Sequence, residues 1–421
     1  MRIKLLKGLI NLIAKIVYWL KRHNGIKDNI KLIIAAIQAP IIFIAFLAAK
    51  LDIHSDNIWL VGEMGVDAKD NGFAFYRYLK REHPKINAVY YINDSFIAAE
   101  KVKELGETVK TNSFNHMKLI FKADYIIATH DQYPLPWKKF NWREFKKLYG
   151  WLNPDLKFVF LQHGVMLSDA KENANYKRTN FDYFVTTAER EYKEISAPVF
   201  GYPHGNVIKT GISRYDRLYE LRNTNVKRQI ILSPTWRQYL ADVSEAEFIE
   251  SNYYKHIESF INNMDFLNFL EEQNVELLFL PPHREIQKFL HLFHTNSNKV
   301  KLLNVDTIDV QDVLLESGVM ITDYSSISMD FGYLRKPVVY YQYDQKEFKK
   351  GHYKTSYYTF EKDGFGPIIK DELNLINQVK KIILNDFQME EFYQKRSIDF
   401  FDLRDAQNSQ RLFNILEKRA D

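Results

Sequence analysis

The stretch Val319-Met-Ile-Thr-Asp-Tyr-Ser-Ser-Ile-Ser-Met-Asp330 predicts a strand, a polar turn and the start of a helix, in that order. Ser325 and Ser326 are residue types that commonly cap a helix N-terminus. Free backbone N–H groups at a helix start bind anions, and the two hydroxyls can add hydrogen bonds to a phosphate. Asp330 lies one helical turn further along and can accept a hydrogen bond from a ribose hydroxyl. A plain serine-capped helix is the simpler interpretation of the same stretch.

The same alternation of strand and helix extends over most of the chain, and this pattern is typical of parallel α/β sheets. The apolar runs that predict strands are Asn57–Val61, Ala88–Ile92, Tyr125–Ala128, Phe158–Gln162, Tyr183–Thr186, Val207–Thr210, Ile230–Ser233, Glu276–Leu280, Lys301–Leu303, Val319–Thr322 and Val338–Tyr341. The charged segment Leu221–Arg228 predicts a linker between two halves. We therefore expect an N-terminal segment at 1–52, a first Rossmann-like domain at 53–222 and a second at 223–421, with a ligand cleft between the domains.

Composition excludes several classes of protein. The 421 residues are 46% hydrophobic and 26% charged, as in a folded globular chain of two or three domains. Because the chain has no cysteine, disulfide scaffolds, cysteine-ligated zinc and iron–sulfur clusters are excluded, and a reducing compartment is favoured. Nine basic residues and one acidic residue fall within 1–50, a net charge of +8, so the rest of the chain carries −3. A chain-wide nucleic-acid surface is not expected.

The first fifty residues predict association with a membrane. Basic and polar residues recur at steps of three and four from Lys4 to Arg22, opposite an apolar face, as in helices that lie on anionic membranes. The uncharged segment Leu32–Ala49 follows, with Gln38 and Pro40 at its middle. It fits a short membrane span, a kinked helix half-buried in one leaflet or a buried core helix, and we favour the in-plane, monotopic arrangement. A core-docked helix is the alternative for the basic stretch.

Three further predicted strands end in residues that can do chemistry at the carboxyl edge of a sheet. His163 precedes Gly164 and can act as a general base near neutral pH. Arg237 follows Ser-Pro-Thr-Trp and can clamp a phosphate. His283 and Arg284 follow two prolines in a third such turn. A structural histidine and surface ion pairs are the simpler interpretations.

Other signatures are absent from the sequence. It contains no phosphate-binding glycine loop ending in Lys-Ser/Thr, no His-Glu-x-x-His, no Gly-x-Ser-x-Gly and no Asp-x-Asp pair for a metal–diphosphate. Nothing in the sequence therefore requires a metal or an organic cofactor. We expect charge on a leaving phosphate to be met by arginine, histidine and a helix N-terminus instead.

Taken together and in order, these motifs resemble the CDP-glycerol glycerophosphotransferase family. The resemblance covers roughly residues 57–384 and rests on Gln162-His-Gly164, Thr210-Gly-Ile-Ser-Arg-Tyr-Asp-Arg-Leu218, Ser233-Pro-Thr-Trp-Arg237, Pro282-His283, Ile321-Thr-Asp-Tyr-Ser-Ser-Ile-Ser-Met-Asp-Phe331, Lys336-Pro-Val-Val-Tyr-Tyr-Gln-Tyr-Asp344 and Phe365-Gly-Pro367. It implies a GT-B fold, two Rossmann-like domains with the active site between them. Many members continue from His-Gly with Thr-Pro-Leu-Lys, whereas this chain has Val-Met-Leu-Ser, and this departure predicts an acceptor side that differs from that of teichoic acid polymerases.

The resemblance also implies roles for individual residues. His163 matches the catalytic histidine and would act as general base on the acceptor hydroxyl, while His283 would contact the donor phosphates. Arg237 and Arg284 would contact the diphosphate, Thr322, Ser325 and Ser326 the donor phosphate, and Asp330 the ribose. Further substrate contacts without a defined role are expected from the same motifs at Gly164, Arg214, Asp216, Thr235 and Asp323.

The implied activity is transfer of glycerol phosphate, or another polyol phosphate, from a CDP-activated donor to an acceptor hydroxyl, with release of CMP. The implied acceptor is a lipid-linked or polymeric glycan of the teichoic acid or capsule type, and the donor is CDP-glycerol or CDP-ribitol. The implied location is the cytoplasmic face of the cell membrane. A metal-independent GT-B glycosyltransferase that uses a nucleotide sugar, and a membrane-bound scaffold with a decayed site, are the alternatives.

Overall fold

The computed structural model describes residues 24–52, 57–137, 140–281, 286–351 and 356–418. These residues form two compact units. One comprises residues up to 161 together with 176–184, and the other comprises 162–175 and 185 onward. The basic helix predicted before residue 24 lies outside the described residues.

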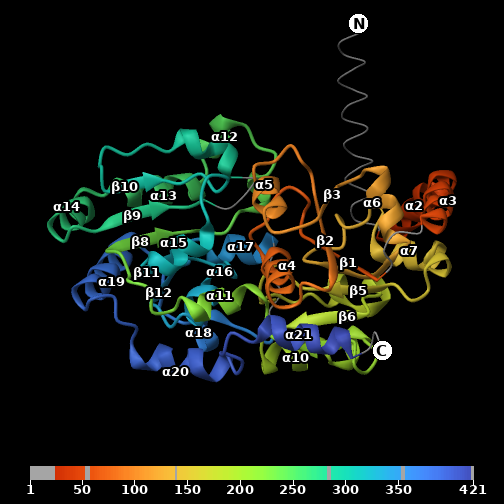
Figure 1. Cartoon of the computed structure of the whole chain (residues 1–421). Coiled ribbons are helices and arrows are strands. Elements are labelled where there is room, and N and C mark those ends of the chain that lie inside the picture. The colour runs from red at the N-terminus through yellow and green to blue at the C-terminus, as the bar shows by residue number, and fades with distance from the viewer. Residues whose placement is uncertain (1–23, 53–56, 138–139, 282–285, 352–355, 419–421) are drawn as a thin grey trace, which may run out of the picture. The chain divides into compact units, whose positions relative to one another are not determined.

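The first sheet has seven strands in the order β3-β2-β1-β4-β5-β6-β7. Neighbouring strands from β3 to β6 pair in parallel, for example Leu60 with Val89 and Ile126 with Phe158. Its strands, labelled where there is room in Figure 1, are β1 (Ile58–Gly62), β2 (Asn87–Ile92), β3 (Thr108–Lys110), β4 (Ala123–Ala128), β5 (Lys157–Phe160), β6 (Tyr183–Thr186) and β7 (Val207–Lys209).

The second sheet has six strands in the order β10-β9-β8-β11-β12-β13, and every pair is parallel. Its strands are β8 (Gln229–Leu232), β9 (Glu276–Phe279), β10 (Val300–Leu302), β11 (Val319–Thr322), β12 (Val338–Tyr341) and β13 (Ile368–Ile369). The next strand along the chain, β9, pairs with one side of β8, and the later strand β11 pairs with the other side of β8. The order of strands therefore reverses between β8 and β11.

Helices connect the strands, as parallel pairing requires. Those before β8 are α2 (Asn24–Ile37), α3 (Ala39–Leu51), α4 (Asn71–Glu82), α5 (Ala98–Lys103), α6 (Phe114–Ile120), α7 (Trp142–Leu148), α8 (Lys171–Ala174), α9 (Tyr176–Thr179), α10 (Glu189–Ile195) and α11 (Arg214–Glu220). Those after β8 are α12 (Glu245–Ile249), α13 (Asn252–Ile261), α14 (Met264–Glu272), α15 (Val310–Glu316), α16 (Ile327–Tyr333), α17 (Gln345–Gly351), α18 (Phe360–Asp363), α19 (Glu372–Leu384), α20 (Glu391–Phe400) and α21 (Asn408–Glu417).

The predicted strands match observed strands to within one or two residues, and two strands were not predicted. The missed strands, β3 and β13, have three and two residues and lie at sheet edges. Strand β3 (Thr-Val-Lys) has a single apolar residue and β13 only two residues, so neither gives an apolar run to detect. The predicted strand Phe158–Gln162 ends earlier, at Phe160, and Gln162 adopts a left-handed backbone with a φ of 60°.

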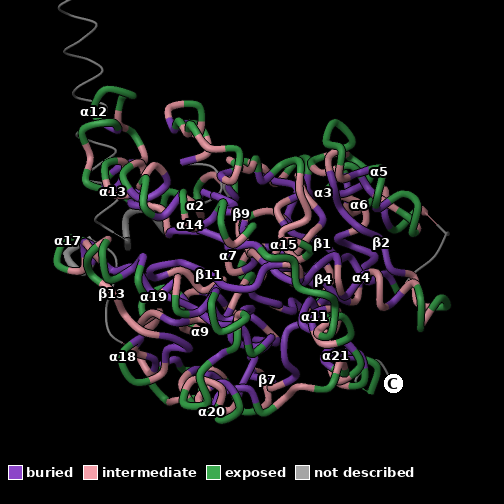
Figure 2. Tube along the Cα trace, turned by 90° about the vertical axis from the view of Figure 1, so that its left-hand side faces the viewer, coloured by how far each residue is buried: buried purple, intermediate pink, exposed green. Residues whose placement is uncertain are grey.

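Burial follows the parallel architecture. Strands β1, β8, β11 and β12 are buried along their whole length, as expected for sheets covered on both faces. Figure 2 shows the labelled strands β1, β2, β4, β9 and β11 largely in the buried colour. In the second sheet, alternate residues such as Ile230 and Ile321 share one core with apolar residues of α13, α14 and α19. Helix α19 supplies Leu375, Ile376, Val379, Ile382 and Ile383, one helical face.

The apolar N-terminal segment folds as two helices with a break between them. Pro40 occupies the first turn of α3, where its missing N–H costs no hydrogen bond, and Gln38 separates α3 from α2. No helix of the described residues is by itself long and apolar enough to cross a membrane. The pair 29–37 and 39–51, bent by 56°, has the length and composition to do so together.

Part of this helix pair packs against its own unit. Tyr149 donates a hydrogen bond to the carbonyl of Ala35 at 3.0 Å, and Phe46 lies edge-on to Phe121. Other apolar side chains stay open to solvent: Ile37 is 73% exposed and Leu51 83%. Ile33, Ile44 and Leu47 are also exposed.

Candidate active site

Strand order places the candidate site at the carboxyl ends of β8 and β11. In open α/β sheets, ligands bind beyond the carboxyl ends of the strands, where the strand order reverses. The segment that follows β8 carries Thr235 and Arg237, and the one that follows β11 carries Asp323, Ser325 and Ser326. The order of strands therefore brings together two of the four motifs that the sequence singles out.

Arg237 is buried and bound by carboxylates rather than open to a ligand. Its side chain is fully enclosed, and it pairs with Asp323 at 2.7 Å and with Asp344 at 2.6 Å. A third hydrogen bond reaches the carbonyl of Thr235 at 2.6 Å, and the ring of Phe348 lies 4.9 Å from the guanidinium carbon. The predicted contact of Arg237 with a diphosphate thus lacks a free guanidinium edge in this structure. Its partners instead indicate a positioning role, tying the loops after β8, β11 and β12 together.

The turn after β11 is fixed by hydrogen bonds to the loop after β8. Asp323 accepts from the backbone N–H groups of Thr235 at 2.7 Å and Tyr324 at 2.6 Å. The hydroxyl of Thr322 donates to the carbonyl of Ser233 at 2.6 Å. Thr322 and Asp323, both predicted to bind substrate, are therefore occupied in shaping the turn.

The hydroxyl groups that follow β8 and β11 are the groups best placed to contact a ligand. Ser326 is half-buried at the cap position of α16, and its hydroxyl makes no cap hydrogen bond. The hydroxyl oxygen of Ser325 accepts a hydrogen bond from the backbone N–H of Ile327, which is long at 3.4 Å. The buried hydroxyl of Thr235 has no hydrogen-bond partner among the described residues. A phosphate would satisfy such hydroxyls.

The His163 turn lies against Ser326. A Cβ atom added to Gly164 would lie 3.1 Å from the Ser326 hydroxyl oxygen and 3.9 Å from a guanidinium nitrogen of Arg214. Arg214 also donates to the carbonyl of His163 at 2.9 Å. The imidazole of His163 is exposed. Glycine at 164 thus allows the turn to approach the serine, and His163 is presented beside it.

Asp330 is paired with protein groups rather than left open. It accepts from Arg214 at 2.8 and 3.1 Å and from the Tyr215 hydroxyl at 2.9 Å, and both carboxylate oxygens are engaged. Burial raises the pKa of Tyr215, and the nearby Asp330 raises it further. A contact between Asp330 and a ribose would have to be made in addition to these three hydrogen bonds. As it stands, the cluster holds Arg214 where it supports the His163 turn.

Asp216 anchors the C-terminal helix. It accepts from the N–H groups of Asn408 at 2.8 Å and Ser409 at 2.9 Å, at the start of α21. Burial raises the pKa of Asp216, and these hydrogen bonds lower it in part. Its contacts indicate a structural role for a residue predicted to bind substrate. His283 and Arg284 lie outside the described residues.

Two residues that sequence reasoning missed hold the site together. Asp344 is the second carboxylate partner of Arg237, and it is the last residue of the motif 336–344, to which the sequence assigned no role. Glu191 accepts hydrogen bonds from the His163 turn. Nothing in the local sequence of α10 points to this role of Glu191, because its partners in the His163 turn are more than twenty residues away. Among the described residues, no group of three or more histidine, aspartate or glutamate side chains could hold a metal ion.

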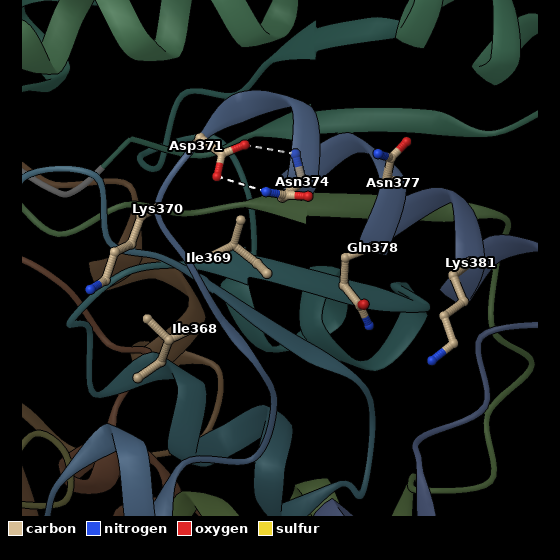
Figure 3. Close-up of a pocket in the computed structure, with 8 residues that line it drawn as sticks. All are labelled: Ile368, Ile369, Lys370, Asp371, Asn374, Asn377, Gln378 and Lys381. Atoms are coloured by element: carbon tan, nitrogen blue, oxygen red, sulfur yellow. Dashed lines mark hydrogen bonds between the residues drawn. The ribbon is translucent and has the colours of Figure 1, made fainter.

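An open groove of about 490 Å³ lies beside the edge strand β13, lined by residues of 368–381. Figure 3 shows the side chains of Asn374, Gln378 and Lys381 from α19 along one wall. Two lysines, Lys370 and Lys381, line the groove. Asp371 lies beside Lys370 in the chain, and Lys381 pairs with Glu390 at 2.9 Å, so each positive charge of the groove has a negative charge near it. None of the predicted site residues lines this groove.

Comparison with known proteins identifies the family. Residues 43–418 match the profile of the family described as CDP-Glycerol:Poly(glycerophosphate) glycerophosphotransferase. The chain belongs to this family. The match extends over nearly the whole described chain, in agreement with the resemblance drawn from the motifs.

Individual relatives agree with this assignment. The chain is 28% identical over 369 residues to the minor teichoic acid biosynthesis protein GgaB of Bacillus subtilis, covering 85% of this chain and 39% of that protein. It is 24% identical to a teichoic acid poly(glycerol phosphate) polymerase of Staphylococcus epidermidis, covering 80% of this chain and 46% of that protein. The chain thus spans less than half the length of both relatives.

Solved structures show the same fold. The wall teichoic acid polymerase TagF superposes with a TM-score of 0.67 at 18% identity, covering 93% of this chain and 95% of that one. A UDP-N-acetylglucosamine 2-epimerase from Listeria monocytogenes superposes with a TM-score of 0.54 at 13% identity, over 87% of this chain and 97% of that one. The predicted fold class, two parallel α/β sheets of the GT-B type, is confirmed.

Proposed function

We propose that this chain transfers a polyol phosphate from a CDP-activated donor to the hydroxyl of a teichoic acid-type acceptor and releases CMP. The observation that carries the proposal is the exposed His163, presented next to the Ser326 hydroxyl within a chain of this family. Relatives are teichoic acid polymerases, and TagF has been studied after soaking with CDPG. Histidine is a suitable general base for a hydroxyl near neutral pH.

The proposed reaction is a direct displacement at the β-phosphorus of the donor. The acceptor oxygen attacks this phosphorus, and His163 takes the proton of the acceptor hydroxyl. The bond from the β-phosphorus to the bridging oxygen breaks, and CMP leaves with that oxygen. The hydroxyls of Ser325 and Ser326 stabilise the charge on the transferred phosphoryl group, since donors fixed in place need no rearrangement during reaction. His283 and Arg284 remain candidates for donor contacts.

We also propose that residues 1–52 bind the cytoplasmic face of an anionic membrane. The basic residues of 1–50 and the exposed apolar side chains of α2 and α3 support this location. A surface that combines positive charge with apolar side chains fits the interface of an anionic bilayer. Flotation with vesicles containing anionic lipid, and none with neutral vesicles at high salt, is the expected outcome.

The test of the activity is CMP release from the purified full chain with a membrane extract as acceptor. CDP-glycerol, CDP-ribitol and UDP-sugars are offered separately, with and without EDTA. We expect release of CMP from a CDP-polyol and no effect of EDTA. Turnover of a UDP-sugar, together with no CMP release from either CDP-polyol, would refute the proposal and favour a nucleotide-sugar glycosyltransferase.

A further inference from the structure

The turn that carries His163 has a backbone that needs outside support. Gln162 has a φ of 60°, in the left-handed region that side-chain-bearing residues seldom adopt. Glycine follows His163 and adds conformational freedom to the same turn. An exposed histidine on such a turn keeps one orientation only if neighbouring groups fix the backbone on both sides of it.

Glu191 of α10 supplies this support from a buried position. Its carboxylate, fully buried, accepts from the side-chain amide of Gln162 at 3.2 Å and from the backbone N–H of Met166 at 2.8 Å. The first contact lies just before His163 and the second lies three residues after it. The amide of Gln162 also donates to the carbonyl of Val185 at 2.6 Å, at the end of β6. Both sides of the turn are therefore bound to one carboxylate.

Ordinary helix capping explains only part of this arrangement. Glu191 also accepts from the N–H of Thr187 at 2.6 Å, a local contact at the start of α10. A residue that served only to cap α10 would need nothing more. The contacts to Gln162 and Met166 cross 29 and 25 residues of sequence and reach the turn itself.

We propose that Glu191 is a positioning residue for His163, holding the turn 162–166 so that the imidazole meets the acceptor hydroxyl. The proposal deepens the proposed function and rests on it for its chemical consequence. A general base misplaced by about 1 Å can cost a hundredfold in rate, because proton transfer demands close alignment. Donor binding by the serine hydroxyls would not depend on Glu191.

The test compares Glu191→Gln with the matched control Glu189→Gln in the full chain. Glutamine has nearly the same shape but only one acceptor oxygen, so it cannot accept both the bonds that Oε1 receives from Gln162 and Met166 and the bond that Oε2 receives from Thr187. Glu189 lies on the same helix and pairs with Lys209 at the surface. We expect kcat for CMP release to fall about 100-fold in Glu191→Gln with an unchanged KM for CDP-glycerol, and no change in Glu189→Gln. Glu191→Asp should restore part of kcat, since it keeps the charge.

Hydrogen exchange of the Met166 amide gives a readout that does not require activity. It should accelerate in Glu191→Gln and stay unchanged in Glu189→Gln. Should Glu191→Gln fail to fold, Gln162→Met removes one of the contacts and should lower kcat and accelerate exchange to a smaller degree. Unchanged kcat and unchanged exchange would overturn the proposal, as would an equal loss of kcat and donor affinity. A wild type that is inactive with CDP-polyols would refute the proposed function, whereas exchange would still decide whether Glu191 fixes the turn.

Discussion

Replacing Arg237 with methionine should strongly destabilise the protein, and the structure sets the size of the effect. Arg237 is fully buried, and its partners Asp323 and Asp344 are exposed by only 2% and 1% of their side chains. Methionine fills a similar space but leaves two buried carboxylates without a cation. Removing one partner of a buried ion pair costs about 3–5 kcal/mol, and two stranded carboxylates place this site at the upper end. Such a loss is a large part of the roughly 5–15 kcal/mol that typically stabilises a folded protein.

The assay is urea unfolding of wild type, Arg237→Met and a matched control, Arg190→Met. Arg190 also pairs with an aspartate, Asp363, at 2.8 Å, but its own side chain is 42% exposed. Exposed pairs contribute about 0–1 kcal/mol, so the control should unfold close to wild type. Adding Asp323→Asn and Asp344→Asn to Arg237→Met should recover part of the loss, because no charge then stays unpaired.

The same variants distinguish two roles for Arg237. A positioning role predicts a lower free energy of unfolding with an unchanged urea dependence of that free energy. A role in binding the donor diphosphate predicts wild-type stability together with weakened binding of CDP-glycerol. A loss below about 1 kcal/mol in Arg237→Met would refute the reasoning from burial.

Three further predictions follow from single contacts. Gly164→Ala should lower kcat for CMP release, because its methyl group would lie 3.1 Å from the Ser326 hydroxyl oxygen. Adding Ser326→Ala should relieve the crowding without restoring the wild-type rate. Full activity of Gly164→Ala in steady-state CMP release would contradict this prediction. Asp216→Ala should cost about 0.5–2 kcal/mol in urea unfolding, because α21 loses the acceptor of two backbone N–H groups, and faster hydrogen exchange should be confined to its first turn. Burial lowers the pKa of His116 to about 3, so below about pH 6.5 this histidine binds a proton in the unfolded chain but not in the folded chain. The contribution of His116 to the free energy of unfolding should therefore fall by about 1.4 kcal/mol per pH unit from pH 6.5 toward pH 3. In urea unfolding at several pH values, His116→Phe should lose this pH dependence.

The sequence predicts the fold well because strand and helix signals are local. The long apolar runs of β8, β11 and β12 are visible without any knowledge of their neighbours. The edge strands β3 and β13 carry one and two apolar residues, too few to stand out in the sequence, and the structure shows them by their pairing with β2 and β12. The break between α2 and α3 follows from Pro40, although α2 ends three residues before the proline.

The roles of the site residues are less predictable because they depend on partners distant in sequence. Arg237, Asp330 and Asp216 have the chemistry of ligand-binding groups, and they lie in the loop after β8, in α16 and in α11. Only the fold shows that their partners are Asp344, Arg214 and the start of α21. Glu191 could not be found from the sequence, because its contact with Gln162 depends on two segments meeting. His163, by contrast, is exposed, and the hydroxyl of Ser326 makes no cap hydrogen bond, so their predicted roles stay predictions.

The central claim is that His163 is the general base of a CDP-polyol phosphotransferase. The most direct test measures CMP release and CDP-glycerol binding for wild type, His163→Ala and His204→Ala, an exposed histidine outside the site. Loss of a general base should lower kcat by about 10²–10⁴-fold. We expect this loss in His163→Ala with an unchanged Kd for CDP-glycerol, and wild-type values in His204→Ala. Near-wild-type turnover in His163→Ala would contradict the account.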